Sequence, residues 1–281
     1  DPALVIAGDM ATPQQVAEIR ARLGLDRSLP EQYMRWALDV LRGDLGVSLI
    51  NRIPVSTLIG QRIDVSTTLA ASAIVLAVAI AIPLGVIAAA NRGKLIDRAV
   101  MTFASAAFAM PAFLVGYGLV AVFSLNLRLL PVQGYRPLDA GLAEFARHLV
   151  LPTLTLSMVY IALLARMTRT TMLEVLNADY IRTARARGLS TGRILFSHAL
   201  KNAAVPIMTT IGTGFALMIG GVVIIESIFA LPGLGRLTVE SVLKRDYPVI
   251  QGVLLLSSTA YLLINIGVDL SYRFFDPRIR Y

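Results

Sequence analysis

The chain has 281 residues, of which 56% are hydrophobic and only 16% are charged, and its formal net charge is +8. A soluble domain carries about 25% charged residues, so this composition excludes an ordinary soluble protein and predicts an integral membrane protein. The absence of cysteine excludes structural disulfides and thiolate metal sites. The basic residues cluster between apolar runs, which is the pattern of membrane topology and not of a nucleic-acid-binding face.

Residues 1–64 are polar and mixed in charge, and we expect them to form a small extracytoplasmic helical segment. Thr12 and Pro13 are typical of the N-cap and first position of a helix, and Gly24 is typical of its end. A second helix is predicted from Leu29 to Leu41, with apolar residues on one face that predict packing as a cap on the rest of the chain. The residues of that face are Tyr33, Trp36, Ala37 and Val40.

Residues 65–281 are expected to form the transmembrane domain. A bilayer core of roughly 30 Å needs about 20 apolar residues in a helix. The stretches that qualify are Val65–Ala90, Ala99–Leu127, Leu149–Ala165, Asn202–Ile225 and Tyr247–Val268. They must be helices because unpaired backbone groups cannot face lipid, so the predicted fold class is all-α, a polytopic helical membrane protein. The prolines expected to kink or begin spans are Pro83, Pro111, Pro152 and Pro206.

Orientation follows from the basic residues of the short loops. The segments after the first and third apolar stretches, and the C-terminal tail, hold an excess of lysine and arginine over the remaining loops. This excess places them in the cytoplasm, so the C-terminus is expected to be cytoplasmic. Five spans would then leave residue 1 outside the cell, and we infer that a sixth, N-terminal span precedes this sequence in the native protein.

A polar, basic segment at about 171–202 lies between two apolar stretches. Asn177 is a candidate N-cap for a short helix, Gly188 suits the left-handed residue that follows a helix, and Ser190 is a candidate N-cap for a second one. Helices this short are not stable alone, so the element must dock on something. One alternative is a membrane surface of anionic headgroups, with the arginines on the polar face. The small side chains of Thr183, Ala184 and Ala186 favour insertion into a protein groove instead.

The same segment resembles a known family. Arg182-Thr183-Ala184, followed by Gly188, is similar to the "EAA…G" loop of permease subunits in bacterial ABC importers. Arg182 stands where that family usually has Glu, and Lys201 where it usually has Pro, and both departures are typical of the dipeptide/oligopeptide/nickel branch. Further segments that look like this branch, which includes dipeptide and glutathione importers, are Asp1-Pro2, Gly43–Gly46 with Ser48, the stretch 226–237 and the stretch 245–251.

The resemblance implies an ABC type I importer-like bundle that forms half of a translocation pathway for peptides (di- or oligopeptides, or glutathione-like). Its partners would be a second homologous permease, two ATP-binding subunits, an extracytoplasmic substrate-binding protein and the lipid of the bacterial inner membrane. ATP and Mg²⁺ would be held by the ATP-binding subunits, and no cofactor by this chain. Coupling would use the loop at 179–200, through Tyr180, Ile181, Arg182, Thr183, Ala184, Arg185, Ala186, Arg187, Gly188 and Leu189.

A second group of residues is predicted at the outer mouth of the bundle. An outer gate or a contact with the binding protein is one interpretation of this group, and a structured external loop is the alternative. Residues 1–64 are a further candidate docking surface for the binding protein. The predicted outer residues are Glu226, Pro232, Gly233, Gly235, Asp246 and Tyr247.

The sequence also bears on other functions. The sequence has no GxxxxGK[ST] loop, so it cannot cradle ATP in that way. Asp64, Glu226 and Asp269 lie at the ends of the apolar stretches, which argues against a proton-driven carrier. The apolar stretches and their flanks contain no paired carboxylates, Ser–His–Asp set or metal-ligand spacing, which argues against a membrane-embedded enzyme. A permease for nickel or another small solute, and an ATP-independent channel or carrier, stay open as alternatives.

Overall fold

The computed structural model describes residues 2–8, 11–22 and 24–275. Within these residues the chain is helical and forms no strand beyond one isolated bridge between Val47 and Pro54. The helices are α1 Pro2–Ala7, α2 Pro13–Arg22, α3 Leu29–Leu41, α4 Val55–Gly60, α5 Ile63–Ala90, α6 Leu95–Ala109, α7 Ala112–Leu119, α8 Leu142–Leu176, α9 Asp179–Ala186, α10 Thr191–Arg193, α11 Leu200–Ile228, α12 Leu234–Leu243 and α13 Tyr247–Phe275. Residue 1 and the tail at 276–281, on which part of the predicted topology rests, lie outside the described residues.

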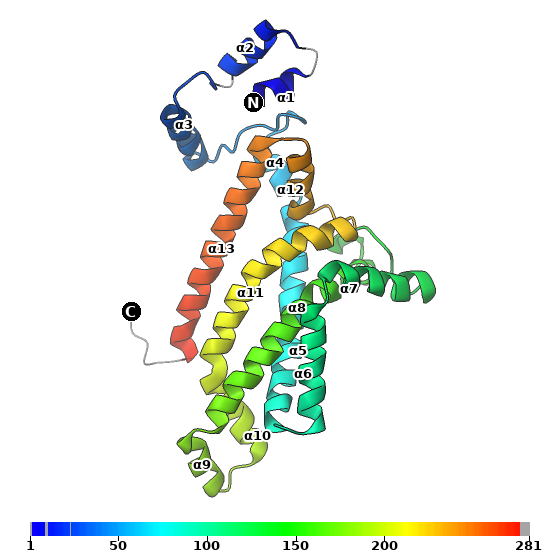
Figure 1. Cartoon of the computed structure of the whole chain (residues 1–281), viewed down its shortest axis with the longest axis vertical. Helices are drawn as coiled ribbons and strands as arrows, with labels where there is room; N and C mark the ends of the chain where they lie inside the picture. The colour runs from blue at the N-terminus through cyan, green and yellow to red at the C-terminus, as the bar shows by residue number, and fades with distance from the viewer. Residues whose placement is uncertain (1, 9–10, 23, 276–281) are drawn as a thin grey trace.

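The long helices give the molecule an elongated shape (Figure 1). Helices α5, α8, α11 and α13 run along its length, α9 and α10 lie at one end, and α1–α3 lie beyond the other, next to α4 and α12. Three helical stretches are long and apolar enough to cross a membrane: Val55–Ala90, Leu142–Leu176 and Tyr247–Tyr272. Two bent pairs, Leu95–Asn126 and Thr191–Ile228, raise the number to five if each counts as one span.

The second predicted span, Ala99–Leu127, is not one straight helix. Helix α6 ends at Ala109 and α7 begins at Ala112, with an angle of 102° across the break. Met110 and Pro111 both have extended backbone, with ψ of 128° and 136°. Proline lacks the N–H that would continue the helix and pushes the residue before it out of the helical region. Pro111 therefore begins a helix, as predicted, whereas Pro83, Pro152 and Pro206 lie inside α5, α8 and α11.

The helix at the third predicted span is longer than the apolar stretch Leu149–Ala165. Helix α8 runs over 35 residues and lies against α5, α6, α7 and α11 at the centre of the bundle. Small residues allow this close packing, since Ala73, Ala77 and Ala81 of α5 are fully buried. At Gly85 a Cβ atom would come within 2.5 Å of Thr168 on α8, so only glycine permits this approach.

The N-terminal helices agree with their predicted bounds but not with the predicted packing. Helices α2 and α3 begin at Pro13 and Leu29, as expected. However, α3 has no buried residue, and its Tyr33 side chain is 63% exposed. The part of residues 1–64 that does pack on the bundle is α4, where Val55, Leu58 and Ile59 join Val249 and Val253 of α13 in one apolar cluster.

Candidate functional site

Helix α9 is attached to its own bundle by a small apolar cluster. Ile181 is fully buried, and Ala184 is 9% exposed. Both pack against Ile194, with Leu176 at the end of α8 and Leu189 completing the cluster. Burial raises the pKa of the Tyr180 hydroxyl, and a hydrogen bond with the Asn202 side chain opposes that shift. The helix is therefore held to both the end of α8 and the beginning of the long helix that follows.

The turn after α9 has the geometry of a Schellman motif. The Gly188 N–H donates to the Arg185 carbonyl at 2.9 Å, and the Leu189 N–H donates to the Ala184 carbonyl at 3.3 Å. Gly188 has a φ of +78°, the left-handed conformation that glycine adopts at low cost. The predicted left-handed glycine is confirmed.

Two other local predictions in this segment were wrong. Ala178, and not Asn177, is the N-cap of α9, and no side chain bonds there, because Asn177 still belongs to the turn that closes α8. Ser190 is at the N-cap of the next helix, as predicted, although its side chain makes no cap hydrogen bond. That helix is not a separate short one, because the chain is helical from Thr191 through Leu200 and on into α11. A motion of α9 would thus reach the start of α11 directly, since no turn separates Thr191 from Leu200.

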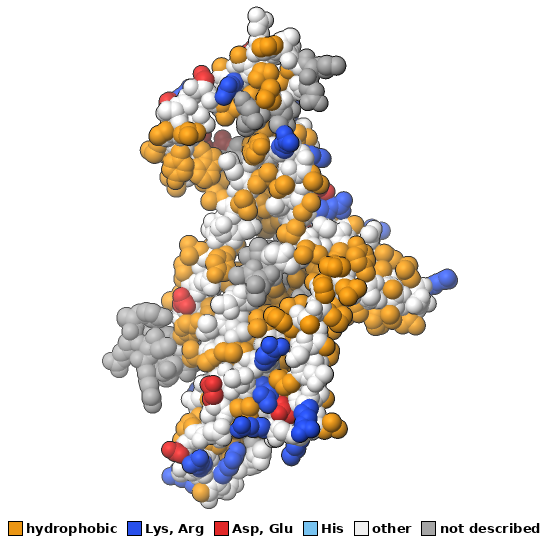
Figure 2. All heavy atoms as spheres, viewed as in Figure 1, with side chains coloured by type: hydrophobic (Ala, Val, Ile, Leu, Met, Phe, Trp, Pro, Cys, Tyr) orange, Lys and Arg blue, Asp and Glu red, His pale blue; other side chains and the backbone are white. Residues whose placement is uncertain are grey.

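The outer face of α9 is polar and exposed. The exposed residues are Asp179, Tyr180, Arg182, Thr183, Arg185, Ala186, Arg187 and Gly188. Asp179 and Arg182 form a pair at 3.3 Å in which both side chains are more than 70% exposed, so this contact adds little stability. Lys and Arg side chains gather over this end of the molecule (Figure 2). Ala184 faces inward, so the small side chains left at the surface are those of Thr183 and Ala186.

At the opposite end, a buried carboxylate caps α12. Glu226, in the last turn of α11, is fully buried. The Arg236 N–H donates to its Oε2 at 2.9 Å, the Gly235 N–H also donates to the carboxylate, and the Ser66 hydroxyl donates to Oε1. Ser66 in turn accepts the Leu234 N–H at 2.8 Å. A carboxylate at a helix N-terminus satisfies free N–H groups and interacts favourably with the helix dipole, so we name this arrangement the Glu226 cap.

The glycines of this turn make room for the cap. A Cβ atom on Gly233 would overlap the Glu226 carboxylate, and one on Gly235 would lie 2.6 Å from the Val223 Cα. The stretch 231–236 is therefore glycine-rich because α12 folds back closely on the end of α11. Pro232, in the turn between α11 and α12, is exposed.

A second buried carboxylate joins the α12–α13 junction to the chain before α4. Asp246 is 3% exposed. Its Oδ1 accepts the Leu49 N–H at 3.0 Å and its Oδ2 accepts the Ser48 hydroxyl. The Asn51 N–H donates to that same hydroxyl oxygen at 3.0 Å. The three outer segments singled out in the sequence, at 43–48, 226–237 and 245–251, thus lie together at one end of the bundle.

Two family descriptions match the chain. Residues 81–281 match "Binding-protein-dependent transport system inner membrane component". The chain belongs to this family. Residues 1–70 match the N-terminal membrane component of binding-protein-dependent transport systems.

Curated relatives cover the whole chain. A Sinorhizobium fredii protein named "Probable peptide ABC transporter permease protein y4tP" is 51% identical over 100% of this chain and 90% of its own length. The Escherichia coli "Dipeptide transport system permease protein DppB" is 37% identical over the same shares of the two chains. The chain is a permease, the membrane-embedded translocation subunit of an ABC transporter, and not an enzyme. Permeases of this kind work with ATPase and other transporter subunits.

Solved structures support the fold of the permease. A chain of the MetNI methionine ABC transporter in an inward-facing conformation aligns with a TM-score of 0.63 over 79% of this permease and 97% of that chain. A second crystal form of that transporter gives 0.64 over 78% and 96%. Both are 17% identical, so the likeness concerns the fold alone. It is the ABC type I importer-like bundle that the sequence resemblance implied.

Of the six predicted outer residues, the permease buries four: Glu226, Gly233, Gly235 and Asp246. Pro232 and Tyr247 are exposed, so they are the members of this group that another protein could contact in this conformation. Burial of the two carboxylates and two glycines agrees with the alternative interpretation, a structured external loop. The gate or binding-protein contact stays a prediction for Pro232 and Tyr247.

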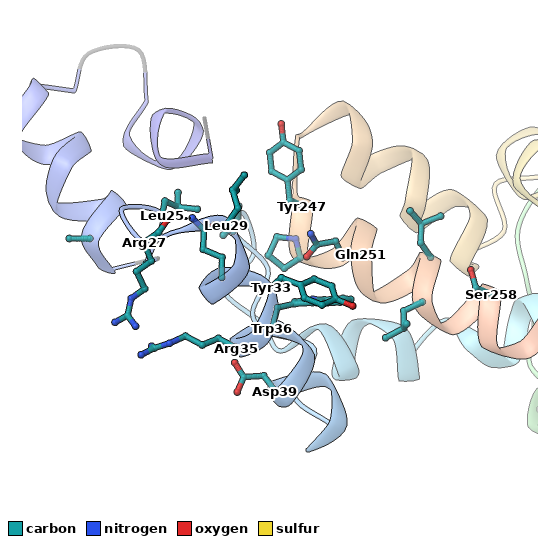
Figure 3. Close-up of a pocket in the computed structure, with 17 residues that line it drawn as sticks. Leu25, Arg27, Leu29, Tyr33, Arg35, Trp36, Asp39, Tyr247, Gln251 and Ser258 are labelled. Atoms are coloured by element: carbon teal, nitrogen blue, oxygen red, sulfur yellow. Dashed lines mark hydrogen bonds between the residues drawn. The ribbon is translucent and has the colours of Figure 1, made fainter.

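An open groove that the sequence did not predict lies beside Tyr247. It has a volume of about 900 Å³ and runs between α3 and the first turns of α13. Tyr33 and Trp36 of α3 point toward α13, and Tyr247 and Gln251 extend from α13 (Figure 3). The Tyr33 and Trp36 rings lie 5.9 Å apart. The helical spacing of the aromatic residues in α3 is the available sequence signal, and it predicts a packed face equally well.

A buried ion pair near the α9 end was also missed. Asp97, at the start of α6, is 4% exposed and pairs with Arg169 of α8. Asp97 lies among Arg92, Lys94 and Arg98, so the sequence pattern predicts an exposed charge of a cytoplasmic loop. Among the described residues, no three His, Cys, Asp or Glu side chains are grouped to hold a metal ion.

Proposed function

We propose that this permease forms one half of the pathway of an ATP-driven importer of peptides in the bacterial inner membrane. The relatives named for peptide and dipeptide transport support the substrate class. In this proposal the C-terminus and α9 are cytoplasmic, and residues 1–64 with the Glu226 cap face the extracytoplasmic side. A second homologous permease completes the pathway, two ATP-binding subunits hold ATP and Mg²⁺, and a substrate-binding protein delivers the peptide.

The observation that carries the coupling role is the exposed face of α9. This short helix buries Ile181 and Ala184 against its own chain and leaves an arginine-rich outer face exposed. Arginines around a docking site provide specificity and orientation more than affinity. Closure of the ATP-binding subunits would move α9, and its attachment to Leu176 and Ile194 would pass that movement to α8 and α11. The bundle would then alternate between inward-open and outward-open states.

On the outer side we propose that the binding protein contacts the exposed residues of the groove and of the α11–α12 turn. Trp36 and Tyr247 offer rigid aromatic surface, the kind of side chain that dominates protein–protein contacts. Substitution of both by alanine should weaken binding of the loaded binding protein to the complex. The basal ATPase rate should stay unchanged, because neither residue lies near α9. An unchanged affinity would contradict this part of the proposal.

The test of the proposed function is uptake by the whole complex in proteoliposomes. Both permeases, both ATP-binding subunits and the binding protein are co-purified, and uptake of dipeptides, glutathione, an oligopeptide and a nickel chelate is measured with and without ATP. ATP-dependent uptake of the peptides alone supports the proposal. Uptake of nickel chelate alone would contradict the substrate class, and uptake without ATP would contradict the mechanism.

A further inference from the structure

The Asp97–Arg169 ion pair joins α6 to α8 through several well-formed hydrogen bonds. Arg169 Nη2 donates to Asp97 Oδ2 at 2.8 Å, and Arg169 Nε donates to Oδ1. The Gly93 N–H, in the turn between α5 and α6, donates to Oδ2 at 2.9 Å. Two-point pairing of arginine with a carboxylate fixes orientation as well as distance. The pair therefore sets where the first turn of α6 lies on α8.

Helix α8 connects this pair to α9. Arg169 lies seven residues before Leu176, the last residue of α8, and Leu176 belongs to the cluster that holds α9. The same stretch of α8 is tightly packed on its α5 side, where Thr168 and Met172 are fully buried. A movement of α9 would therefore reach Arg169 through a continuous, well-packed helix.

The other described contacts between α6 and α8 are apolar or exposed. Their shared apolar cluster consists of Ala104, Ala107 and Ala162, with Met158 packed against it. The Arg166 guanidinium lies 5.5 Å from the centre of the Phe108 ring, in an exposed contact. These alanine contacts are close but apolar and carry no hydrogen bond, so they fix the relative orientation of the two helices less than a two-point ion pair does. The ion pair is the directional link between the two helices near the α9 end.

We propose that Asp97 and Arg169 are a positioning pair that makes α6 move with α8 during the transport cycle. Neither residue touches substrate or ATP. Without the pair, movement of α9 would still displace α8, but α6 would follow only in part. Helix α7, which comes after α6 across the bend at Pro111, would also follow only in part. The proposal rests on the proposed function only in assuming that α9 receives the movement.

The test uses variants that separate positioning from stability. Asp97→Asn keeps an oxygen that can accept the Gly93 N–H but removes the charge, and Arg169→Gln removes the partner. The double variant Asp97→Asn/Arg169→Gln leaves neither charge unpaired, so it should be more stable than either single variant. Arg98→Gln is the matched control, because it removes an exposed positive charge from the same turn. Complex assembly, thermal stability and substrate transported per ATP hydrolysed are measured for each.

If the pair transmits movement, transport per ATP falls by about tenfold in both single variants and in the double variant, a change within the range of known coupling free energies. Stability recovers in the double variant, while transport per ATP does not. If the pair only stabilises the fold, the double variant recovers both, and the proposal is overturned. Normal transport per ATP in either single variant, or a loss in Arg98→Gln as large as theirs, also overturns it.

A distance measurement gives a result that does not depend on substrate. Because this chain has no cysteine, spin labels can be placed on the exposed Ser105 of α6 and the exposed Glu174 of α8 without removing thiols from the permease, and thiols of the other subunits are blocked or replaced. In the otherwise native complex the distance between the labels should be the same in nucleotide-free and ATP-bound states. In the double variant it should differ between them. An unchanged distance in the double variant would overturn the pairing role even if the uptake assay supports the proposed function.

Discussion

The Glu226 cap offers the most direct test of how the outer end is held together. Glu226→Ala removes the acceptor of the Ser66 hydroxyl and of the Gly235 and Arg236 N–H groups, all in a buried site. A buried donor left unsatisfied costs about 1–3 kcal/mol. With partial relief by entering water, we expect α12 to lose about 3–5 kcal/mol of stability, at the upper end of single-residue effects. Glu226→Gln keeps one acceptor oxygen and should cost about 1–3 kcal/mol.

The assay is protection of a buried thiol on α12. Ser241 is 5% exposed, and Ser241→Cys places a single cysteine in a chain that has none. The labelling rate of this thiol in the folded complex reports the free energy of local opening. A loss of 3–5 kcal/mol corresponds to labelling roughly 100- to 4000-fold faster, since each 1.4 kcal/mol is about tenfold.

Glu240→Ala is the matched control. Glu240 also lies on α12 and contacts Arg236 at 2.9 Å and Arg62 at 3.6 Å, but its side chain is 37% exposed. Each of these two pairs contributes about 0–1 kcal/mol, so losing both should raise the labelling rate by about 25-fold at most. The reasoning is refuted if Glu226→Ala accelerates labelling by less than about fivefold, or by no more than Glu240→Ala does.

Other predictions concern the two ends of the bundle. Gly188→Val forces a β-branched residue into the left-handed region, which costs about 1–2 kcal/mol, so transport and stimulated ATPase activity should fall. The control Gly192→Val, in an open helical position, should keep nearly native activity. Equal activities of the two variants would contradict this prediction. Ala184→Glu places a charge on the inner face of α9 and should abolish co-purification of the ATP-binding subunits together with α9 docking. Ala186→Glu, on the exposed face, should weaken co-purification without lowering thermal stability, and undiminished co-purification would refute the proposed interface. Ser48→Ala removes the buried hydroxyl, before α4, that donates to Asp246 at the α12–α13 junction. It should destabilise the complex by about 1–3 kcal/mol, measured by thermal unfolding, and no measurable loss would contradict the described contact.

Much of the fold could be predicted because hydropathy and backbone preference act locally. A run of apolar residues must be helical in lipid whatever surrounds it, so five apolar stretches were found, although Leu149–Ala165 was drawn too short. Gly188 was identified because the left-handed conformation after a helix favours glycine in any context. Pro111 was flagged, but the 102° bend was not, because proline interrupts hydrogen bonding while neighbouring helices decide the angle.

The sequence by itself therefore determined the class of protein, the helical stretches, the turn at Gly188 and the resemblance that gives the family. Only the tertiary structure decided which partners the buried acidic residues have. These partners lie far away in the sequence: 72 residues separate Asp97 from Arg169, 160 separate Ser66 from Glu226, and 198 separate Ser48 from Asp246. It also decided that Ala184 faces inward. The physical reason is that a charge is tolerated in a buried site only where another element brings a partner, and helix packing, which no local pattern specifies, brings that partner into place.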